Sequence, residues 1–186
     1  MPAGQEPFSL YVHIPYCISK CPYCDFNSHV VPEIPEANYT EALIQELNHY
    51  ARMNHWRGRS VQTIFFGGGT PSTFQPSSIA RILERANVLF PMDSAREITL
   101  DANPGTVESA NFAGYRSYGV NRISVGVQSF QPHLLKFLGR VHSADEAVKA
   151  LQVIADAGFE NFSLDLIYAN PSQTLRDLEN DLDTAI

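Results

Sequence analysis

Residues 9–26 read SLYVHIPYCISKCPYCDF, an apolar strand-like run that leads directly into all three cysteines of the chain. The cysteines are Cys17, Cys21 and Cys24, and their spacing is C-x3-C-x2-C. Each iron of a [4Fe–4S] cluster takes one protein ligand, so three thiolates hold three irons and leave the fourth open to a small chelating molecule. The spacing therefore favours an iron–sulfur cluster with one open iron.

Zinc is the main alternative for this cysteine motif. Structural zinc sites use four Cys or His ligands, usually from paired C-x2-C units. This chain has one such pair, so the fourth ligand would have to be His13 or His29. An odd number of closely spaced thiols is a poor disulfide framework, and reduced cysteines indicate a reducing compartment.

Composition excludes several classes of protein. The chain has 186 residues, enough for one domain with a sizeable core, and 44% of them are hydrophobic. The net charge of −7 argues against a nucleic-acid partner. No stretch approaches the roughly 20 apolar residues of a membrane span. Residues 1–7 lack the charged segment and apolar run of a secretory signal. We therefore expect a soluble, cytoplasmic protein.

Short apolar runs alternate with helical patterns along the chain. Strands are expected at residues 9–14, 63–66, 97–101, 122–127 and 161–167, each bounded by Gly, Pro or Asn. Helical faces are expected at 39–50, 79–89, 106–118 and 144–157. The last of these opens with a capping box from Ser143 to Glu146 and closes at Gly158.

This alternation predicts an α/β fold with right-handed βαβ units and a parallel sheet. Five strands cannot close an eight-stranded barrel, so an open, partial (β/α) barrel is favoured, and a doubly wound open sheet fits the same pattern. Helical spacing at Leu175, Leu178 and Leu182 runs to residue 186 without a stop signal. We interpret residues 1–186 as one incomplete domain, truncated after about five strand–helix units.

Polar and glycine residues follow the expected strands where parallel α/β folds place their function. The strand at 63–66 is followed by Gly67, Gly68, Gly69 and Thr70. Asp101 ends the strand at 97–101, Gln128 and Arg140 follow the strand at 122–127, and Asp165 lies within the strand at 161–167. Bare glycine backbone can approach a ligand closely. No Gly-Lys-Ser/Thr follows it, so the segment is not a phosphate-binding P-loop.

Each of these residues also has a structural alternative. The glycines are typical of a tight turn. A carboxylate in an apolar strand is costly unless it is paired or faces a polar cavity, so Asp101 and Asp165 would each form an ion pair with arginine, or Asp101 would cap a turn beside Asn103. Gln128 would satisfy backbone groups, and Arg140 would be a solvated charge. Together, beside an open iron, they favour a binding set for a small polar ligand.

The combined motifs resemble a known superfamily. The cysteine spacing, with Tyr23 before the last cysteine, resembles the radical SAM signature, and residues 67–71 (GGGTP) resemble that superfamily's methionine-binding segment. More narrowly, residues 10–17, 101–106, 126–130 and 138–140 resemble the oxygen-independent coproporphyrinogen III oxidase group. The resemblance covers essentially the whole chain and implies a radical SAM core domain of the partial-barrel type.

The resemblance also implies roles for the site residues. Cys17, Cys21 and Cys24 would ligate three irons, and S-adenosylmethionine would chelate the fourth. No catalytic residue is assigned. The implied contacts to the cofactor are Tyr11 and Tyr23 beside it, and the methionine-binding segment Gly67, Gly68, Gly69 and Thr70, in which Gly68 and Gly69 would meet the amino group. Asp101, Gln128, Arg140 and Asp165 would hold its polar remainder.

The position two residues after the last cysteine separates two branches of this group. The coproporphyrinogen dehydrogenases resemble C-x3-C-x2-C-x-C, whereas this chain has Phe26 in place of the further cysteine. It thus resembles the HemW-like branch, which implies a haem chaperone with haem as cargo, haem-accepting apoproteins and an electron donor as partners. The alternative is an oxygen-independent coproporphyrinogen III dehydrogenase, so whether the protein is an enzyme stays open. The group often has Glu at the position of Asp101.

Overall fold

The computed structural model describes residues 6–186, apart from the side chains of residues 94 and 95, so most of the segment considered for a secretory signal lies outside it. Five parallel strands form one sheet in the order β1-β4-β5-β6-β7. They are β1 (Phe8–Ile14), β4 (Val61–Gly68), β5 (Met92–Ala102), β6 (Arg122–Gln128) and β7 (Phe162–Leu166). All five predicted strands are confirmed, and β5 begins earlier than predicted.

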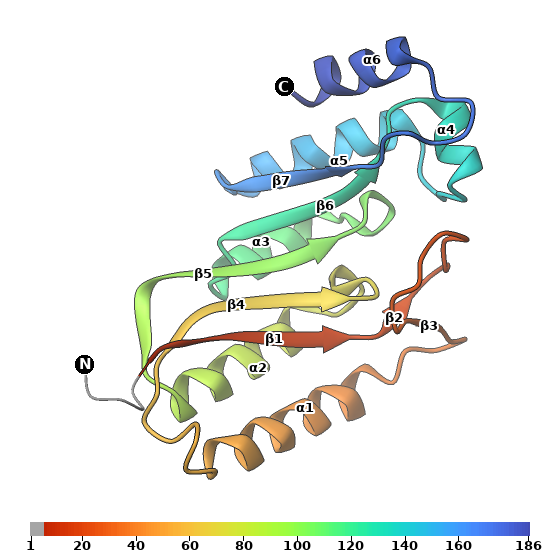
Figure 1. The fold of residues 1–186 in the computed structure, drawn as a ribbon. Helices are drawn as coiled ribbons and strands as arrows, with labels where there is room; N and C mark the ends of the chain where they lie inside the picture. Colours follow the sequence, from red (N-terminus) through yellow and green to blue (C-terminus); the bar gives the residue numbers. More distant parts are fainter. Residues whose placement is uncertain (1–5) are drawn as a thin grey trace.

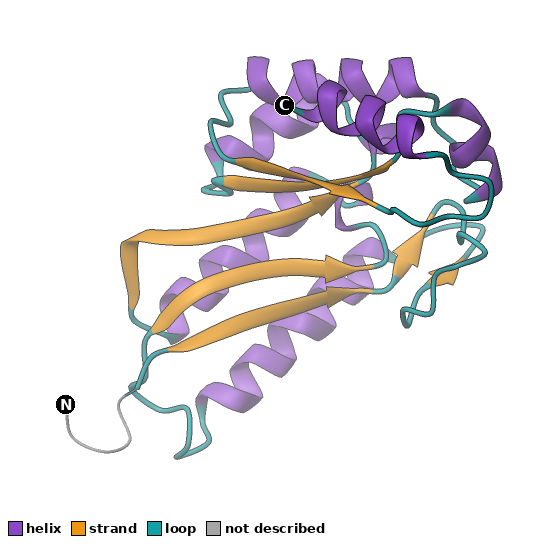
Figure 2. Cartoon of the chain, turned by 45° about the horizontal axis from the view of Figure 1, so that its top comes forward, coloured by secondary structure: helices purple, strands orange, loops and turns teal. Residues whose placement is uncertain are grey.

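The connecting helices lie along one face of the sheet (Figures 1 and 2). They are α1 (Glu36–Ala51), α2 (Pro76–Leu89), α3 (Ser109–Ser117) and α5 (Ala144–Asp156). Because every strand is added on the same side of its predecessor, right-handed crossovers place all the helices on one face. The sheet is therefore wound in one direction, as in a partial barrel, and the doubly wound alternative is wrong.

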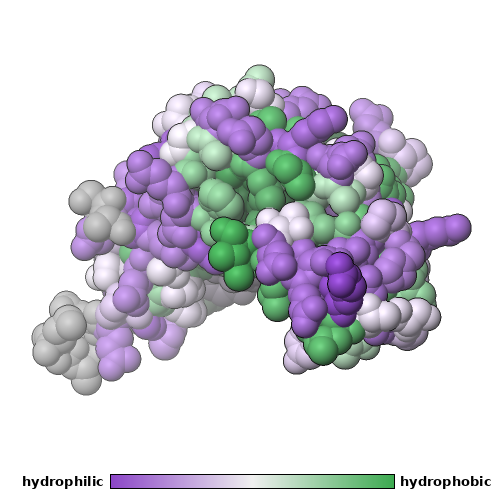
Figure 3. Space-filling view, turned by 90° about the horizontal axis from the view of Figure 1, so that it is seen from above, coloured by the Kyte–Doolittle hydropathy of each residue, from purple (hydrophilic) through white to green (hydrophobic). Residues whose placement is uncertain are grey.

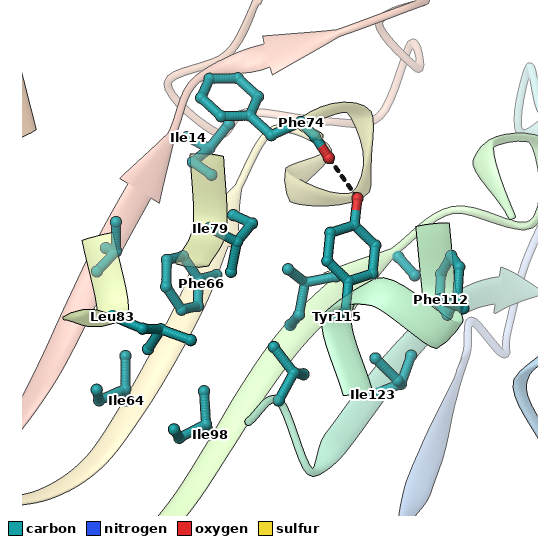
Figure 4. Close-up of a cluster of buried hydrophobic side chains, with 14 of the residues drawn as sticks. Ile14, Ile64, Phe66, Phe74, Ile79, Leu83, Ile98, Phe112, Tyr115 and Ile123 are labelled. Atoms are coloured by element: carbon teal, nitrogen blue, oxygen red, sulfur yellow. Dashed lines mark hydrogen bonds between the residues drawn. The ribbon is translucent and has the colours of Figure 1, made fainter. Parts of the chain in front are cut away.

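Alternate residues of each strand face the helices and form the core. Ile14, Phe66, Leu100 and Ile123 are completely buried there. Figure 4 shows Ile14, Phe66 and Ile123 of the strands in one cluster with Ile79 and Leu83 of α2 and Phe112 and Tyr115 of α3. The buried Tyr115 hydroxyl donates to the carbonyl of Phe74. The opposite, concave face carries the other set of residues, including Tyr11, Phe65, Thr99 and Arg122, which follow one another in register across four strands.

The predicted helix ends are largely confirmed. Ser143 Oγ accepts from the amide of Glu146, Glu146 Oε2 accepts from the amide of Ser143, and Gly158 follows α5 with a φ of +86°. The third helix begins at Ser109 rather than residue 106, because Pro104–Thr106 form a 3₁₀ turn (η2) in which the Asn103 side chain accepts from the amide of Gly105.

Four further short elements were not predicted. The strands β2 (Tyr16–Cys17) and β3 (His29–Val30) pair with each other and bracket the cysteine loop. The 3₁₀ helix η1 (Pro71–Thr73) follows the glycine segment, and α4 (Pro132–Phe137) follows β6. These elements are too short to carry a readable hydrophobic period.

The β7 side of the molecule is the more exposed one. The last helix, α6 (Leu175–Ala185), begins at a capping box of Thr174 and Asp177 and lies beyond β7 in Figure 1. Seen from the α6 side, hydrophobic atoms gather in the middle of the face (Figure 3), and the exposed apolar residues of these two elements include Phe162, Leu175 and Leu182. Within the described chain, no helix is both long and apolar enough to span a membrane.

Candidate functional site

One cavity lies at the carboxyl ends of the strands, with a volume of about 320 Å³. Every predicted site residue except Tyr11 and Gly67 lines it. These two residues lie immediately behind its wall, since a Cβ on Gly67 would come 2.9 Å from the Tyr11 ring and 3.1 Å from Asp101 Oδ2. The fold therefore brings residues from all five strand ends to one place, as the sequence predicts.

The cysteine loop is fixed at both of its ends. The amide of His29 donates to the carbonyl of Pro15 at 2.6 Å, which closes the loop beside β2 and β3. Within it, Lys20 Nζ donates to the carbonyls of Phe26 and Ser28 at 3.1 and 3.2 Å. The three thiols are free and half-buried, and all three line the cavity.

A turn after α4 packs against this loop. Gly139 has a φ of +64°, and a Cβ there would come 2.5 Å from Cδ of Pro22, which lies between two of the cysteines. Glycine is needed at this position for both its backbone conformation and the close approach. The contact sets the position of the next residue, Arg140, relative to the cysteines.

Gly68, Gly69 and Thr70 of the glycine segment line the cavity. The amides of Gly69 and Thr70 donate to the carbonyls of Ile14 and Tyr16, each at 2.7 Å, so these two N–H groups are already used. A Cβ on Gly69 would come within 2.5–2.8 Å of the Tyr16 backbone, so the tight-turn explanation holds for that glycine. Because the amides of Gly69 and Thr70 are occupied, these two residues lack the free N–H groups that a phosphate site needs, whereas glycine carbonyl oxygens can accept from a ligand ammonium.

Arg140 is a built-in part of the site, so the solvated-charge alternative is wrong. Its Nη2 donates to the carbonyl of Gly126 at 2.7 Å, and its Nη1 lies 3.2 Å from Cys21 Sγ and 3.4 Å from the Tyr23 hydroxyl. Its Nε is buried and has no partner among the described residues. Desolvation by burial is the main reason that the pKa of Tyr23 is raised to about 12.

Two carboxylates approach the cavity from β5 and β7. Asp101 and Ser124 are neighbours in register, and Ser124 Oγ donates to Asp165 Oδ2 at 3.3 Å. Burial raises the pKa of Asp101 to about 6, and the negative charge of Asp165 adds to this shift. Arg122 lies 4.0 Å from Glu97, the one carboxylate in the described chain with which it forms an ion pair. Asp101 is thus a cavity carboxylate that an arginine does not pair, and Asn103 caps the following turn by itself.

Gln128 has a strained backbone. Its φ of +72° lies in the left-handed region, which is uncommon for residues other than glycine and is found at functional sites. The carbonyl of Gln128 accepts from the amide of Ile167 at 2.9 Å, so the conformation is held by the junction of β6 and β7. The sequence gives no signal of this strain.

His13 links β1 to the far end of the cysteine loop. Its Nε2 lies 2.9 Å from the carbonyl of Asn27 and therefore donates, which leaves Nδ1 to accept from the Tyr11 hydroxyl at 3.0 Å. Both ring nitrogens are thus occupied, as expected for a hydrogen-bonded structural histidine. His13 is not free to serve as a fourth zinc ligand.

The donor set fits a [4Fe–4S] cluster better than a single metal ion. Among residues 6–186, no three His, Cys, Asp or Glu side chains converge closely enough to hold one ion. A zinc site requires that convergence, whereas the cysteines of a cluster each bind a different iron and stand further apart. The buried, unpartnered Nε of Arg140 fits a ligand carboxylate, and the glycine segment, in which the amides of Gly69 and Thr70 are already used, fits a ligand ammonium.

Several cavity residues were missed by sequence reasoning. They include Ser19, Lys20, Ser28, Ser124, Gly126 and Ile167. Ser124 carried a usable signal, since it interrupts an apolar strand in the same way as Asp101 does. Gly126 is explained only by the fold: a Cβ there would come 2.9 Å from Gln128 Nε2.

Comparisons with known proteins agree with this geometry. The model of the radical SAM superfamily matches residues 11–185. The chain is 45% identical over 181 residues to the heme chaperone HemW of Escherichia coli K12, covering 97% of this chain and 47% of that protein. It is 46% identical to the heme chaperone HemW of Haemophilus influenzae, again covering 97% of this chain and 48% of that protein.

A solved structure is similar over the same span. The coproporphyrinogen III oxidase HemN of Escherichia coli, a radical SAM enzyme, superposes with a TM-score of 0.87 at 31% identity, covering 97% of this chain and 42% of that one. The chain thus spans about half the length of the curated relatives it matches. Its partial-barrel fold and the match over residues 11–185 place it in the radical SAM superfamily.

Proposed function

We propose that the protein containing this chain is a haem chaperone of the HemW type that carries a [4Fe–4S] cluster and binds S-adenosylmethionine. The observation that carries the proposal is one cavity that is lined by three thiols, a glycine segment and a half-buried arginine. Its cargo is haem, its partners are haem-accepting apoproteins and an electron donor, and its location is the cytoplasm. Similarity to the two HemW proteins supports this choice.

The residues of this chain have separate proposed tasks. Cys17, Cys21 and Cys24 ligate three irons. The carbonyls of Gly68 and Gly69 accept from the ammonium of S-adenosylmethionine, with Gly67 and Thr70 shaping the segment on either side, and Arg140 donates to its carboxylate. Asp101, Gln128 and Asp165 accept from its hydroxyl and amino groups, with Tyr11 and Tyr23 beside it. The cluster, when bound, supplies the electron for reduction of the sulfonium group.

A second candidate is the oxidative decarboxylation of coproporphyrinogen III. The close superposition on HemN favours it. Phe26 argues against it, because it stands at the position of the further cysteine in the C-x3-C-x2-C-x-C pattern of the dehydrogenases. Phe26 lines the cavity and is 64% exposed. We therefore prefer haem transfer.

The test starts with the full-length protein, purified without oxygen and reconstituted with iron and sulfide. Low-temperature EPR of the dithionite-reduced sample should give a [4Fe–4S]⁺ signal that shifts when S-adenosylmethionine is added. Cys21→Ser should lose the cluster, whereas Ser19→Ala in the same loop should keep it. Tightly bound zinc without iron would overturn the radical SAM part of the proposal.

A second measurement separates the two candidates. Haem titration followed by transfer to an apoprotein, monitored by absorbance, should succeed with the reconstituted protein. Conversion of propionate to vinyl groups on coproporphyrinogen III, without haem transfer, would instead establish the dehydrogenase.

A further inference from the structure

The hydroxyl of Thr70 points at one of the cysteine ligands. Thr70 Oγ1 lies 3.6 Å from Cys17 Sγ, a normal distance for a hydrogen bond to sulfur, and the residue is only 7% exposed. Its backbone is held on both sides: the amide donates to Tyr16, and the carbonyl accepts from the amide and the hydroxyl of Thr73 at 3.0 and 2.7 Å. The backbone bonds therefore fix the place from which the hydroxyl donates.

Arg140 makes the equivalent contact with a second cysteine. Its Nη1 lies 3.2 Å from Cys21 Sγ, and the guanidinium is anchored on the other side by the carbonyl of Gly126. The turn at Gly139, packed on Pro22, holds the start of this side chain beside the loop. For the third cysteine, Cys24, no side-chain donor to the sulfur is found within residues 6–186.

Hydrogen bonds to cysteine sulfurs are one of the factors that set the reduction potential of an iron–sulfur cluster. Reduction adds one negative charge, part of which resides on the sulfurs. A donor aimed at a sulfur therefore stabilises the reduced form more than the oxidised form and raises the potential. A positively charged donor adds a Coulombic term of the same sign.

We propose that Thr70 and Arg140 tune the cluster by donating to Cys17 and Cys21, so that both residues raise its reduction potential. This inference rests on the proposed [4Fe–4S] site but not on haem transfer. For Arg140 it adds a role to the proposed contact with S-adenosylmethionine, and for Thr70 it assigns a task to the side chain.

The test is an EPR-monitored redox titration of the full-length, reconstituted protein before any S-adenosylmethionine is added. Without the cofactor, any effect of Arg140 on the potential is separate from its effect on cofactor binding. Thr70→Val and Arg140→Gln should each lower the equilibrium constant for reduction by about tenfold, which is about 59 mV for one electron. Thr70→Ser, which retains a hydroxyl, should stay close to the wild type.

Two matched variants control for general effects. Thr106→Val removes a hydroxyl that bonds the carbonyl of Asn103 rather than a sulfur, and Lys136→Gln removes an exposed positive charge from the helix just before Arg140. Both should leave the potential close to that of the wild type. If Arg140→Gln fails to assemble a cluster, the pair Thr70→Val and Thr70→Ser still decides the question.

Unchanged potentials in Thr70→Val and Arg140→Gln, with a normal cluster signal, would overturn the inference and leave the proposed function intact. A wild-type protein that holds no cluster would overturn both. A fall in affinity for S-adenosylmethionine with no shift in potential would limit Arg140 to binding the cofactor.

Discussion

The two sides of the cavity are held in different ways. On the cysteine side, backbone packs directly on backbone or on a rigid ring, as at Gly69 against Tyr16 and Gly139 against Pro22. On the β7 side, Asp165 lies on an exposed strand, and its link to the neighbouring strand is a 3.3 Å hydrogen bond from Ser124. Close packing thus fixes the conformation of the cysteine loop, whereas the opposite wall of the cavity depends on polar contacts. Substitutions on the two sides should therefore differ in their cost.

The largest effect is expected at Gly69. In Gly69→Ala, the new Cβ would lie 2.5–2.8 Å from main-chain atoms of Tyr16, which cannot rotate away as a side chain can. We expect a loss of about 3 kcal/mol or more in the free energy of unfolding, as for severe overpacking. Urea unfolding of the full-length protein measures it, and iron content after reconstitution should fall as well.

Gly105→Ala is the matched control for this variant. Gly105 is also near the cavity, but the nearest atom to its Cβ would be Val141 Cγ2 at 3.8 Å, an ordinary contact. Its unfolding free energy should change by less than about 0.5 kcal/mol. Equal losses in the two glycine variants would show that close packing does not distinguish the cysteine side.

On the β7 side, one buried carboxylate, Asp181 of α6, is expected to contribute strongly to stability. This carboxylate is buried and accepts from Ser129 Oγ at 2.8 Å, the amide of Phe130 at 2.7 Å and Gln131 Nε2 at 3.1 Å, just after the strained Gln128. Asp181→Ala leaves these donors without their acceptor and should cost about 2–3 kcal/mol. The exposed Asp183→Ala on the same helix should cost less than about 0.5 kcal/mol. A small loss at Asp181, measured by urea unfolding, would show that α6 does not support this wall.

Asp181 also shows where prediction from the sequence ends. The positions of the strands and main helices, and the convergence of Cys17 and Arg140, follow from periodicity and from the rule that parallel strands carry function at their carboxyl ends. The buried carboxylate gave no signal, because it stands among three other acidic residues (Asp177, Glu179 and Asp183) on a helix whose sequence looks solvent-exposed. Its partner segment lies some fifty residues earlier, and only the fold brings the two together.

The left-handed Gln128 and the glycine contacts were equally inaccessible. Backbone strain at Gln128 depends on the irregular pairing of β6 with β7, and the need for glycine at 139 depends on Pro22 far away in the chain. Glycine and proline in a sequence predict where turns lie, but they do not predict which distant atoms those turns contact.

Asp101 lies between the two sides, and its stability contribution should depend on pH. Burial raises its pKa to about 6, above the ordinary value of 3.8, so the folded protein binds this proton more tightly than the unfolded chain does. Stability from this group is therefore present below pH 4 and is lost as the pH rises to 6. Asp101→Asn should be more stable than the wild type by about 1–2 kcal/mol at pH 8 and nearly equal to it at pH 4.

Urea midpoints of the Asp101 variant and the wild type across pH 4–8 measure this difference. Asp25→Asn, an exposed carboxylate of the cysteine loop, is the control and should show no trend of this size. A gain that is independent of pH would mean that Asp101 is not held against ionisation by its surroundings.

The smallest effect on stability is expected at Asp165, where the comparison between the two sides is sharpest. Asp165→Ala removes an exposed carboxylate with one long hydrogen bond, so unfolding should change by less than about 0.5 kcal/mol. Because Asp165 is a proposed contact to S-adenosylmethionine, the same variant should bind the cofactor roughly tenfold more weakly, which is equivalent to about 1.4 kcal/mol. Urea unfolding and an EPR-monitored cofactor titration separate the two effects. A loss of stability comparable to that of Gly69→Ala would show that this wall is as firmly built as the cysteine side, and unchanged cofactor affinity would remove Asp165 from the binding set.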